Sequence, residues 1–170
     1  MLLGPVLDSI RAAGILKNLH NLHVRMARHS ANALFLAGRL GKMGLAVHYP
    51  GLMRHPQHEL MMRMMNRGFG FGGIVAVDVG DKATADRLMM RMQEEKVGYL
   101  AVSLGYFKTL FSVPGHSTSS EIPQEVRLRM GMGDGLIRFS VGLDNDIQRT
   151  WETISGLLHE VGVARHRAIA

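Results

Sequence analysis

The order of the sequence patterns predicts an α/β fold, a two-layer sandwich in which helices pack on a sheet of about four short strands. Residues 73–79 are almost all apolar or β-branched, as in a buried strand. Residues 81–92 instead repeat apolar side chains every three or four positions, as on one face of a helix. These two kinds of pattern alternate over 170 residues, a length that suits one domain with extensions.

The remaining elements follow from the same two periodicities. A helical pattern extends over residues 8–41 and is strongest over 21–40. The apolar residues that recur there are Met26, Ala33, Leu34, Ala37 and Leu40. Further helices are expected over 56–65 and 144–159, and further strands over 45–49, 97–103 and 136–141. The polar segment 112–124 contains two prolines and predicts a long loop.

The composition limits the classes of partner. The net charge is +6, but the basic residues are scattered among apolar residues of helical segments, so we expect no nucleic-acid partner. No cysteine is present, which excludes disulfides and thiolate chemistry and is compatible with a cytoplasmic location. The longest apolar runs are shorter than the ~20 residues of a membrane span, so we expect no membrane partner. The 13 methionines are expected to fill much of the core.

Three motifs suggest chemistry but favour simpler interpretations. The glycines of residues 68–73 follow a helix and precede a strand, whereas a dinucleotide fingerprint needs the opposite order, so they predict a turn. His55, His58 and His116 occur without cysteine or a zinc-protease motif, so no metal site is expected. The hydroxyl-rich stretch 117–120 lacks the glycines of a nucleophile elbow and predicts a loop that could donate hydrogen bonds to a ligand.

Arg138 is a charged residue inside the otherwise apolar strand 136–141. Such a residue usually lies on the solvated face of a sheet. The alternative is a guanidinium that binds a carboxylate through two parallel charge-assisted hydrogen bonds. The pattern alone leaves both interpretations open.

Several short stretches resemble the trans-sulfuration enzymes, the Cys/Met metabolism family of pyridoxal-phosphate (PLP) enzymes. The similar stretches are Arg25 and Met26, His29, Asn32 and Ala33, Tyr49 to Leu52, His55 to Leu60, Phe71 to Gly73, Ala101 to Gly105, and Gly135 to Gly142. They keep the order and spacing of that family from about residue 20 to 158. Within the family, residues 117–121 most resemble methionine γ-lyases of the plant type.

The resemblance implies the small C-terminal domain of a fold-type I PLP enzyme and assigns roles to four residues. Arg138 matches the arginine that binds the substrate α-carboxylate, and Ser103 and Thr118 match substrate-binding residues near it. Lys108 stands where many relatives have an acidic residue at the substrate entrance, which makes it a possible specificity residue. Because PLP serves as an electron sink, a carboxylate clamp would orient the bond that breaks.

The resemblance also implies that much of the enzyme lies outside this chain. In the family, a large N-terminal domain carries the Schiff-base lysine and binds most of the PLP. None of the five lysines here lies in the family's Ser-x-Thr-Lys context, so we expect no catalytic residue in the chain and no activity from it alone. The expected domains are residues 1–20, a linker and helix leaving the missing domain, residues 21–160, the C-terminal domain, and residues 161–170, a frayed tail.

The function that the resemblance implies is substrate-carboxylate binding in a PLP-dependent C–S lyase that acts on sulfur amino acids. A methionine γ-lyase-like α,γ-elimination is the first expectation, and a cystathionine γ-lyase or γ-synthase is the sister alternative. A truncated, non-catalytic paralogue that serves as a binding or assembly module is the third. The family also implies a homo-oligomer, a dimer or a tetramer.

Overall fold

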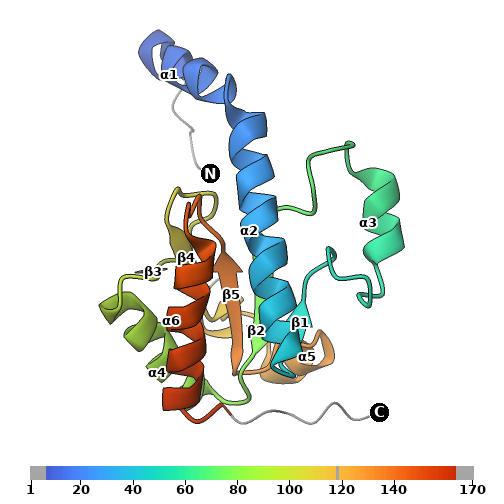
Figure 1. The fold of residues 1–170 in the computed structure, drawn as a ribbon, viewed down its shortest axis with the longest axis vertical. Helices are drawn as coiled ribbons and strands as arrows, with labels where there is room; N and C mark the ends of the chain where they lie inside the picture. Colours follow the sequence, from blue (N-terminus) through green and yellow to red (C-terminus); the bar gives the residue numbers. More distant parts are fainter. Residues whose placement is uncertain (1–6, 118, 164–170) are drawn as a thin grey trace.

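A mixed five-stranded sheet forms the centre of the computed structural model, which describes residues 7–117 and 119–163 (Figure 1). The strands are β1 (Ala46–His48), β2 (Ile74–Asp78), β3 (Gly98–Leu100), β4 (Thr109–Ser112) and β5 (Leu136–Ser140). Their order is β1-β2-β5-β4-β3. All neighbouring strands are antiparallel except β3 and β4, which are parallel. β5 is therefore central, with a strand on each side.

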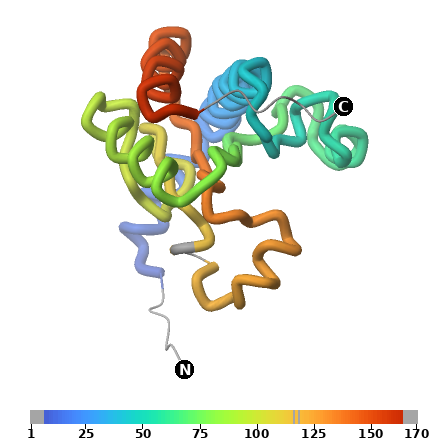
Figure 2. The backbone as a smooth tube through the Cα atoms, turned by 90° about the horizontal axis from the view of Figure 1, so that it is seen from below, coloured from blue at the N-terminus to red at the C-terminus, as the bar shows by residue number. Residues whose placement is uncertain are grey.

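Three long helices cover one face of this sheet. The helices are α1 (Ser9–Leu19), α2 (Leu22–Lys42), α3 (His58–Met64), α4 (Lys82–Glu94), α5 (Gln124–Arg129) and α6 (Ile147–Glu160), with a 3₁₀ turn η1 (Pro114–His116). Apolar residues of α2, α4 and α6 share one buried cluster with the strands. Figure 2 shows α2 and α6 together on one side of the sheet and residues 119–135 on the other.

The α/β class and the core helices are confirmed. Along α4, the four residues expected to face the core are all buried: Ala85, Leu88, Met89 and Met92. They pack with Val75 and Val77 of β2 and with Ile137 and Phe139 of β5. The prediction that methionines fill much of the core is wrong, because Met89 and Met92 are the only buried methionines among the described residues. Branched aliphatic residues make up most of the core instead.

The structure corrects the number and length of the strands. It has five strands rather than about four, because residues 109–111 were assigned to no element and Ser112, the last residue of β4, was assigned to the loop. All four residues of β4 are buried, so they show no apolar–polar alternation, and Pro114 follows closely. The strand expected over 97–103 ends at Leu100, and the loop expected over 112–124 is followed by α5.

The structure also divides the long helical region into two helices and leaves two helices exposed. The helical region 8–41 consists of α1 and α2, separated at His20 and Asn21. Neither α1 nor α3 contains a buried residue, although an apolar face was expected over 56–65. Both project from the body of the domain (Figure 1). Residues 1–6 and 164–170, expected to be a loop and most of a frayed tail, lie outside the described residues.

Buried polar side chains of α2 and of the segment after β1 fix the ends of the central strands. His29 Nδ1 lies 2.6 Å from the carbonyl oxygen of Val141, just after β5. Asn32 donates to the carbonyls of Gly142 at 3.0 Å and Asp144 at 2.8 Å. These long-range bonds hold the end of β5 against α2 and thereby position the strand that carries Arg138.

Tyr49, which follows β1, binds the backbone just before β2. Its hydroxyl donates to the carbonyl of Gly72 at 2.8 Å, and its side chain is 0% exposed. Burial raises the pKa of Tyr49 to about 12, because the phenolate would lose its hydration. The phenol therefore stays neutral and serves as a structural donor.

Candidate carboxylate-binding site

Arg138 lies in the middle of β5, between β2 and β4. Its backbone is opposite Ala76 of β2 and Ser112 of β4. The adjacent residues Ile137 and Phe139 point into the core beneath the three helices. Because side chains alternate along a strand, Arg138 points to the opposite face of the sheet.

Residues 101–107, which follow β3, are tied to this face near Arg138. Arg138 Nη2 donates to the carbonyl of Val102 at 2.9 Å. The backbone N–H of Gly105 donates to Ser140 Oγ at 3.0 Å, and Ser140 is two positions from Arg138 on the same strand face. Arg138 is half-buried and bonded rather than freely solvated.

Ser103 is brought to the same place. The carbonyl that binds Arg138 belongs to the peptide group joining Val102 to Ser103. Ser103 itself is exposed, so a ligand beside Arg138 could reach its hydroxyl. Thr118, the third predicted substrate-binding residue, lies outside the described residues.

Lys108 is not grouped with these residues. It precedes β4 by one position and lies four positions before Ser112, about 13 Å of extended chain from the residue opposite Arg138. It lines a separate hollow of about 380 Å³ together with Lys96, Asp144 and Asn145. The structure thus places the possible specificity residue at a different part of the surface.

Three buried side-chain polar atoms have no hydrogen-bond partner within the described residues: Arg127 Nε, Arg138 Nε and Ser112 Oγ. Two of them, Arg138 Nε and Ser112 Oγ, belong to residues that are paired across β4 and β5. The two residues are direct cross-strand neighbours, and the Cβ atoms of such a pair lie about 4.5–5.5 Å apart. Sequence reasoning missed Ser112 because it assigned this position to a loop. Only the pairing of β4 with β5 shows that it adjoins Arg138.

The donors on this face suit a carboxylate. A guanidinium offers five N–H donors in a planar fork, and a hydroxyl can add another donor or an acceptor. All five lysines of the chain are exposed: Lys17, Lys42, Lys82, Lys96 and Lys108. None occupies a buried position of the kind that would hold a cofactor covalently.

The histidines and apolar helices of the described part of the chain suggest no competing site. In residues 7–117 and 119–163, no three His, Cys, Asp or Glu side chains are grouped to hold a metal ion. His58 Nδ1 lies 2.7 Å from the carbonyl of Pro50, and its ring stacks on Phe71. No helix of the described part is both long and apolar enough to cross a membrane.

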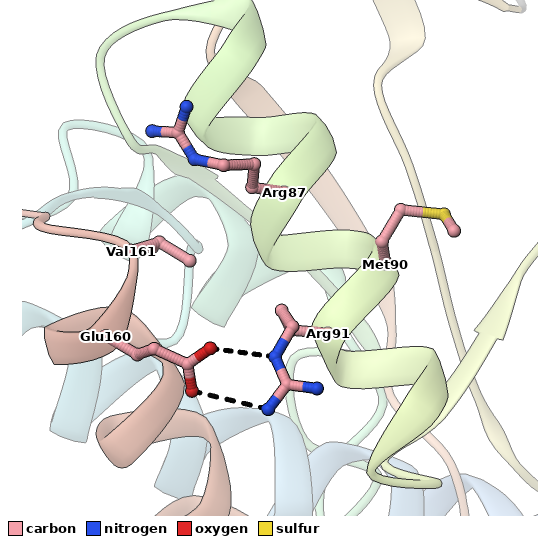
Figure 3. A pocket seen from close by; sticks show the side chains of 5 residues that line it. All are labelled: Arg87, Met90, Arg91, Glu160 and Val161. Atoms are coloured by element: carbon pink, nitrogen blue, oxygen red, sulfur yellow. Dashed lines mark hydrogen bonds and ion pairs between the residues drawn. The ribbon is translucent and has the colours of Figure 1, made fainter.

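A second hollow, of about 450 Å³, lies between α4 and α6 and is lined by charged side chains (Figure 3). Arg91 and Glu160 point toward one another there, and Met90 points away. The hydrogen bonds from Arg91 hold the pKa of the Glu160 carboxyl below its usual value. Within this hollow Arg91 and Glu160 bind each other, so we interpret the hollow as a helix–helix contact.

Comparison with known proteins shows which proteins this chain is similar to. Over 152 residues, 89% of this chain, it is 40% identical to a methionine gamma-lyase of Arabidopsis thaliana, of which it covers 34%. Over 132 residues, 76% of this chain, it is 39% identical to a cystathionine gamma-lyase of Dictyostelium discoideum, of which it covers 33%. The chain therefore spans about a third of the length of these relatives.

Solved structures show the same domain within larger chains. One is an enzyme of Campylobacter jejuni assigned as an O-acetylhomoserine (thiol)-lyase, which carries a pyridoxyl-lysine phosphate. It matches with a TM-score of 0.77 and 27% identity over 85% of this chain and 34% of its own. Another is a cystathionine gamma lyase of Micromonospora echinospora, with a TM-score of 0.72 and 37% identity over 84% of this chain and 36% of its own.

The resemblance noted in the sequence is thereby confirmed. The model of the Cys/Met metabolism PLP-dependent enzyme family matches residues 1–149, most of the chain. The methionine gamma-lyase of Arabidopsis thaliana named above is 40% identical over 89% of this chain. This chain belongs to the Cys/Met metabolism family of PLP-dependent enzymes.

Proposed function

We propose that this chain is the substrate-carboxylate-binding domain of a PLP-dependent C–S lyase that acts on sulfur amino acids. The observation that carries the proposal is Arg138, a half-buried guanidinium on the sheet face away from the helices, with an unpartnered Nε. Such a group is suited to bind the α-carboxylate of an amino acid through two parallel bonds. Ser103, beside the same guanidinium, would add a hydroxyl, and Thr118 is proposed as a third contact.

In this proposal the chain orients the substrate. Bound PLP would supply an electron sink, and the residues here would hold the amino acid so that the reacting bond has the right direction. Arg138 would fix the carboxylate, and Ser103 would limit rotation about it. The lysine that attaches PLP would come from a domain outside this chain, so we expect the chain alone to be inactive.

For the reaction, we favour a methionine γ-lyase-like α,γ-elimination that yields a thiol, ammonia and a 2-oxo acid. The longer match to the methionine gamma-lyase of Arabidopsis, over 89% of this chain against 76% for the cystathionine gamma-lyase of Dictyostelium, supports this choice. Lys108 is the proposed specificity residue, because a cation there would disfavour substrates with a charged distal amino group. We further propose a cytoplasmic homo-oligomer as the assembled form.

A second candidate is a non-catalytic binding or assembly module. The exposed positions of all five lysines agree with it as well as with the first proposal, because neither assigns a covalent cofactor contact to this chain. In that case Arg138 would be dispensable, and the chain would act by docking on a full-length relative.

A complementation experiment separates the candidates. The chain is co-expressed with the PLP-binding N-terminal part of the Arabidopsis methionine γ-lyase, and thiol release from L-methionine and from L-cystathionine is measured. Restored turnover of methionine that falls by about 30-fold or more in Arg138→Lys, but is retained in the surface control Arg39→Lys, would support the lyase domain. A stable complex without turnover, unchanged by Arg138→Lys, would support the assembly module.

A further inference from the structure

We infer that Ser112 is a positioning residue for Arg138, whose Nε donates to the hydroxyl of Ser112 in solution. The inference rests on the proposed function only in the use that it gives Arg138. It starts from two buried polar atoms, Arg138 Nε and Ser112 Oγ, that both lack a partner within the described residues. One is an obligatory donor and the other can accept, so each can satisfy the other.

The sheet register makes this pairing accessible. Ser112 and Arg138 are directly opposite in the antiparallel pair β4–β5, so both side chains leave the same face. On the other side of Arg138 the opposite residue is Ala76, whose side chain has no polar atom. Of the two cross-strand neighbours, only Ser112 can therefore accept from Nε. A small rotation of the guanidinium would bring the two atoms into a hydrogen bond. This bond would remove the free-energy cost of leaving each of them buried and unpaired.

The same bond would orient the rest of the guanidinium. In the present geometry Nη2 is held by the carbonyl of Val102 at 2.9 Å. A carboxylate is a stronger acceptor than a carbonyl and would displace it. With Nε held by Ser112, Arg138 would keep its plane during this exchange and present both amino groups to the ligand.

Ser112 acts through Arg138 rather than on the ligand. Its side chain is 6% exposed, and its Oγ is buried. A ligand that reaches the exposed Ser103 does not thereby reach Ser112. We therefore expect Ser112 to limit the mobility of the Arg138 side chain and to slow the hydrogen exchange of its Hε.

The test uses the 170-residue chain labelled with ¹⁵N and follows the Nε–Hε signal of Arg138, assigned by its loss in Arg138→Lys. We expect hydrogen exchange of Hε to be about tenfold faster in Ser112→Ala than in the unchanged chain, as for loss of one hydrogen bond. Ser112→Thr keeps the hydroxyl and should restore slow exchange. Ser120→Ala, at an exposed serine, is the matched control and should have no effect.

A second arm of the experiment tests the proposed function separately. L-methionine is added, with L-methioninamide, which lacks the carboxylate, as the control ligand. Slow exchange that depends on Ser112, without any shift from methionine, would retain the positioning role and reject carboxylate binding by Arg138 in this chain. Exchange that is equally fast with serine and alanine at position 112 would overturn the inference, whatever methionine does. If the threonine variant does not fold, the alanine variant, with its fold checked by circular dichroism, decides the outcome.

Discussion

Arg91 on α4 and Glu160 at the end of α6 join the two helices through a two-point ion pair (Figure 3). Arg91 Nε donates to Glu160 Oε1 at 2.8 Å, and Nη2 donates to Oε2 at 3.4 Å. Arg91 also pairs with Glu94 and Glu95 on its own helix. The pair is at the surface, so solvent and salt screen it, and its contribution to stability is small.

The first prediction uses the pH dependence of this pair. The hydrogen bonds from Arg91 lower the pKa of Glu160, so the ion pair stabilises the folded state fully above the unfolded-state pKa of Glu160. This stabilisation is lost as the pH falls through the lower pKa that Glu160 has in the folded state. We expect Glu160→Gln to reduce the melting temperature slightly at pH 7 and to have less effect at pH 3. Thermal melts at both values check this, with Glu152→Gln on the same helix as the control. An equal effect at both pH values would contradict the role of the charge.

The second prediction concerns Tyr49. Tyr49→Phe leaves the carbonyl of Gly72 without its donor and should lower the free energy of unfolding by about 1–3 kcal/mol at pH 8. Because the folded-state pKa is raised to about 12, the phenol favours folding fully below pH ~10, and this contribution is lost as pH rises toward 12.

Urea unfolding of the two proteins at pH 8 and above pH 10 measures the effect. The difference between wild type and Tyr49→Phe should shrink at the higher pH. The variant Tyr106→Phe is the control, because Tyr106 is exposed and should show no such dependence. A constant difference across this range would mean that Tyr49 ionises normally.

How far the sequence predicted this fold depends on whether a feature is local. The strand 73–79 and the helix 81–92 were predicted because their periodicity lies within one segment, and the structure confirms both as β2 and α4. β4 was missed because it is buried on both sides in a sheet of short strands and so lacks alternation. Long-range pairing, rather than its own residues, defines it.

The residues of the candidate site also differ in whether the sequence alone could identify them. Arg138 could be singled out from the sequence because a charge in an apolar strand is a local anomaly, and the family resemblance gave it a role. Ser112 could not, because its importance depends on which residue of β5 lies opposite it. The role of Lys108 at the substrate entrance rests on the resemblance alone and stays a prediction, and in this domain Lys108 lines a hollow together with Asp144.

The third prediction concerns the carboxylate clamp in the assembled enzyme. Arg138→Lys replaces a planar fork with one point charge, so kcat/KM for the amino acid should fall by about 30- to 1000-fold, or ~2–4 kcal/mol. The domain should stay folded, because Arg138 points away from the core. Steady-state kinetics and a thermal melt of the same preparation test both statements. Unfolding of Arg138→Ala would instead make the residue structural, and unchanged turnover would place the clamp elsewhere.

The fourth prediction concerns cofactor retention. All five lysines are exposed, so PLP bound by the chain alone should be removed by dialysis. Borohydride reduction before dialysis, followed by peptide mass spectrometry, should show at most dispersed labelling over these lysines. Labelling concentrated at one lysine, with a visible absorbance band that survives dialysis, would show that this chain holds PLP itself.

The last prediction concerns self-association through α1. The helix has no buried residue, and its apolar side chains are largely exposed: Ile10 at 86%, Ile15 at 51%, Leu16 at 60% and Leu19 at 50%. On the neighbouring helix α2, by contrast, much of the apolar face is buried. Exposed apolar patches favour association, so we expect the chain to self-associate at high concentration.

The double variant Ile15→Asp/Leu19→Asp should shift the chain toward monomer in light scattering and sedimentation. Met90→Asp, at an equally exposed position on α4, is the control and should leave association unchanged. A wild-type chain that is monomeric at high concentration would reject the prediction, and equal effects of both variants would assign association to net charge rather than to α1.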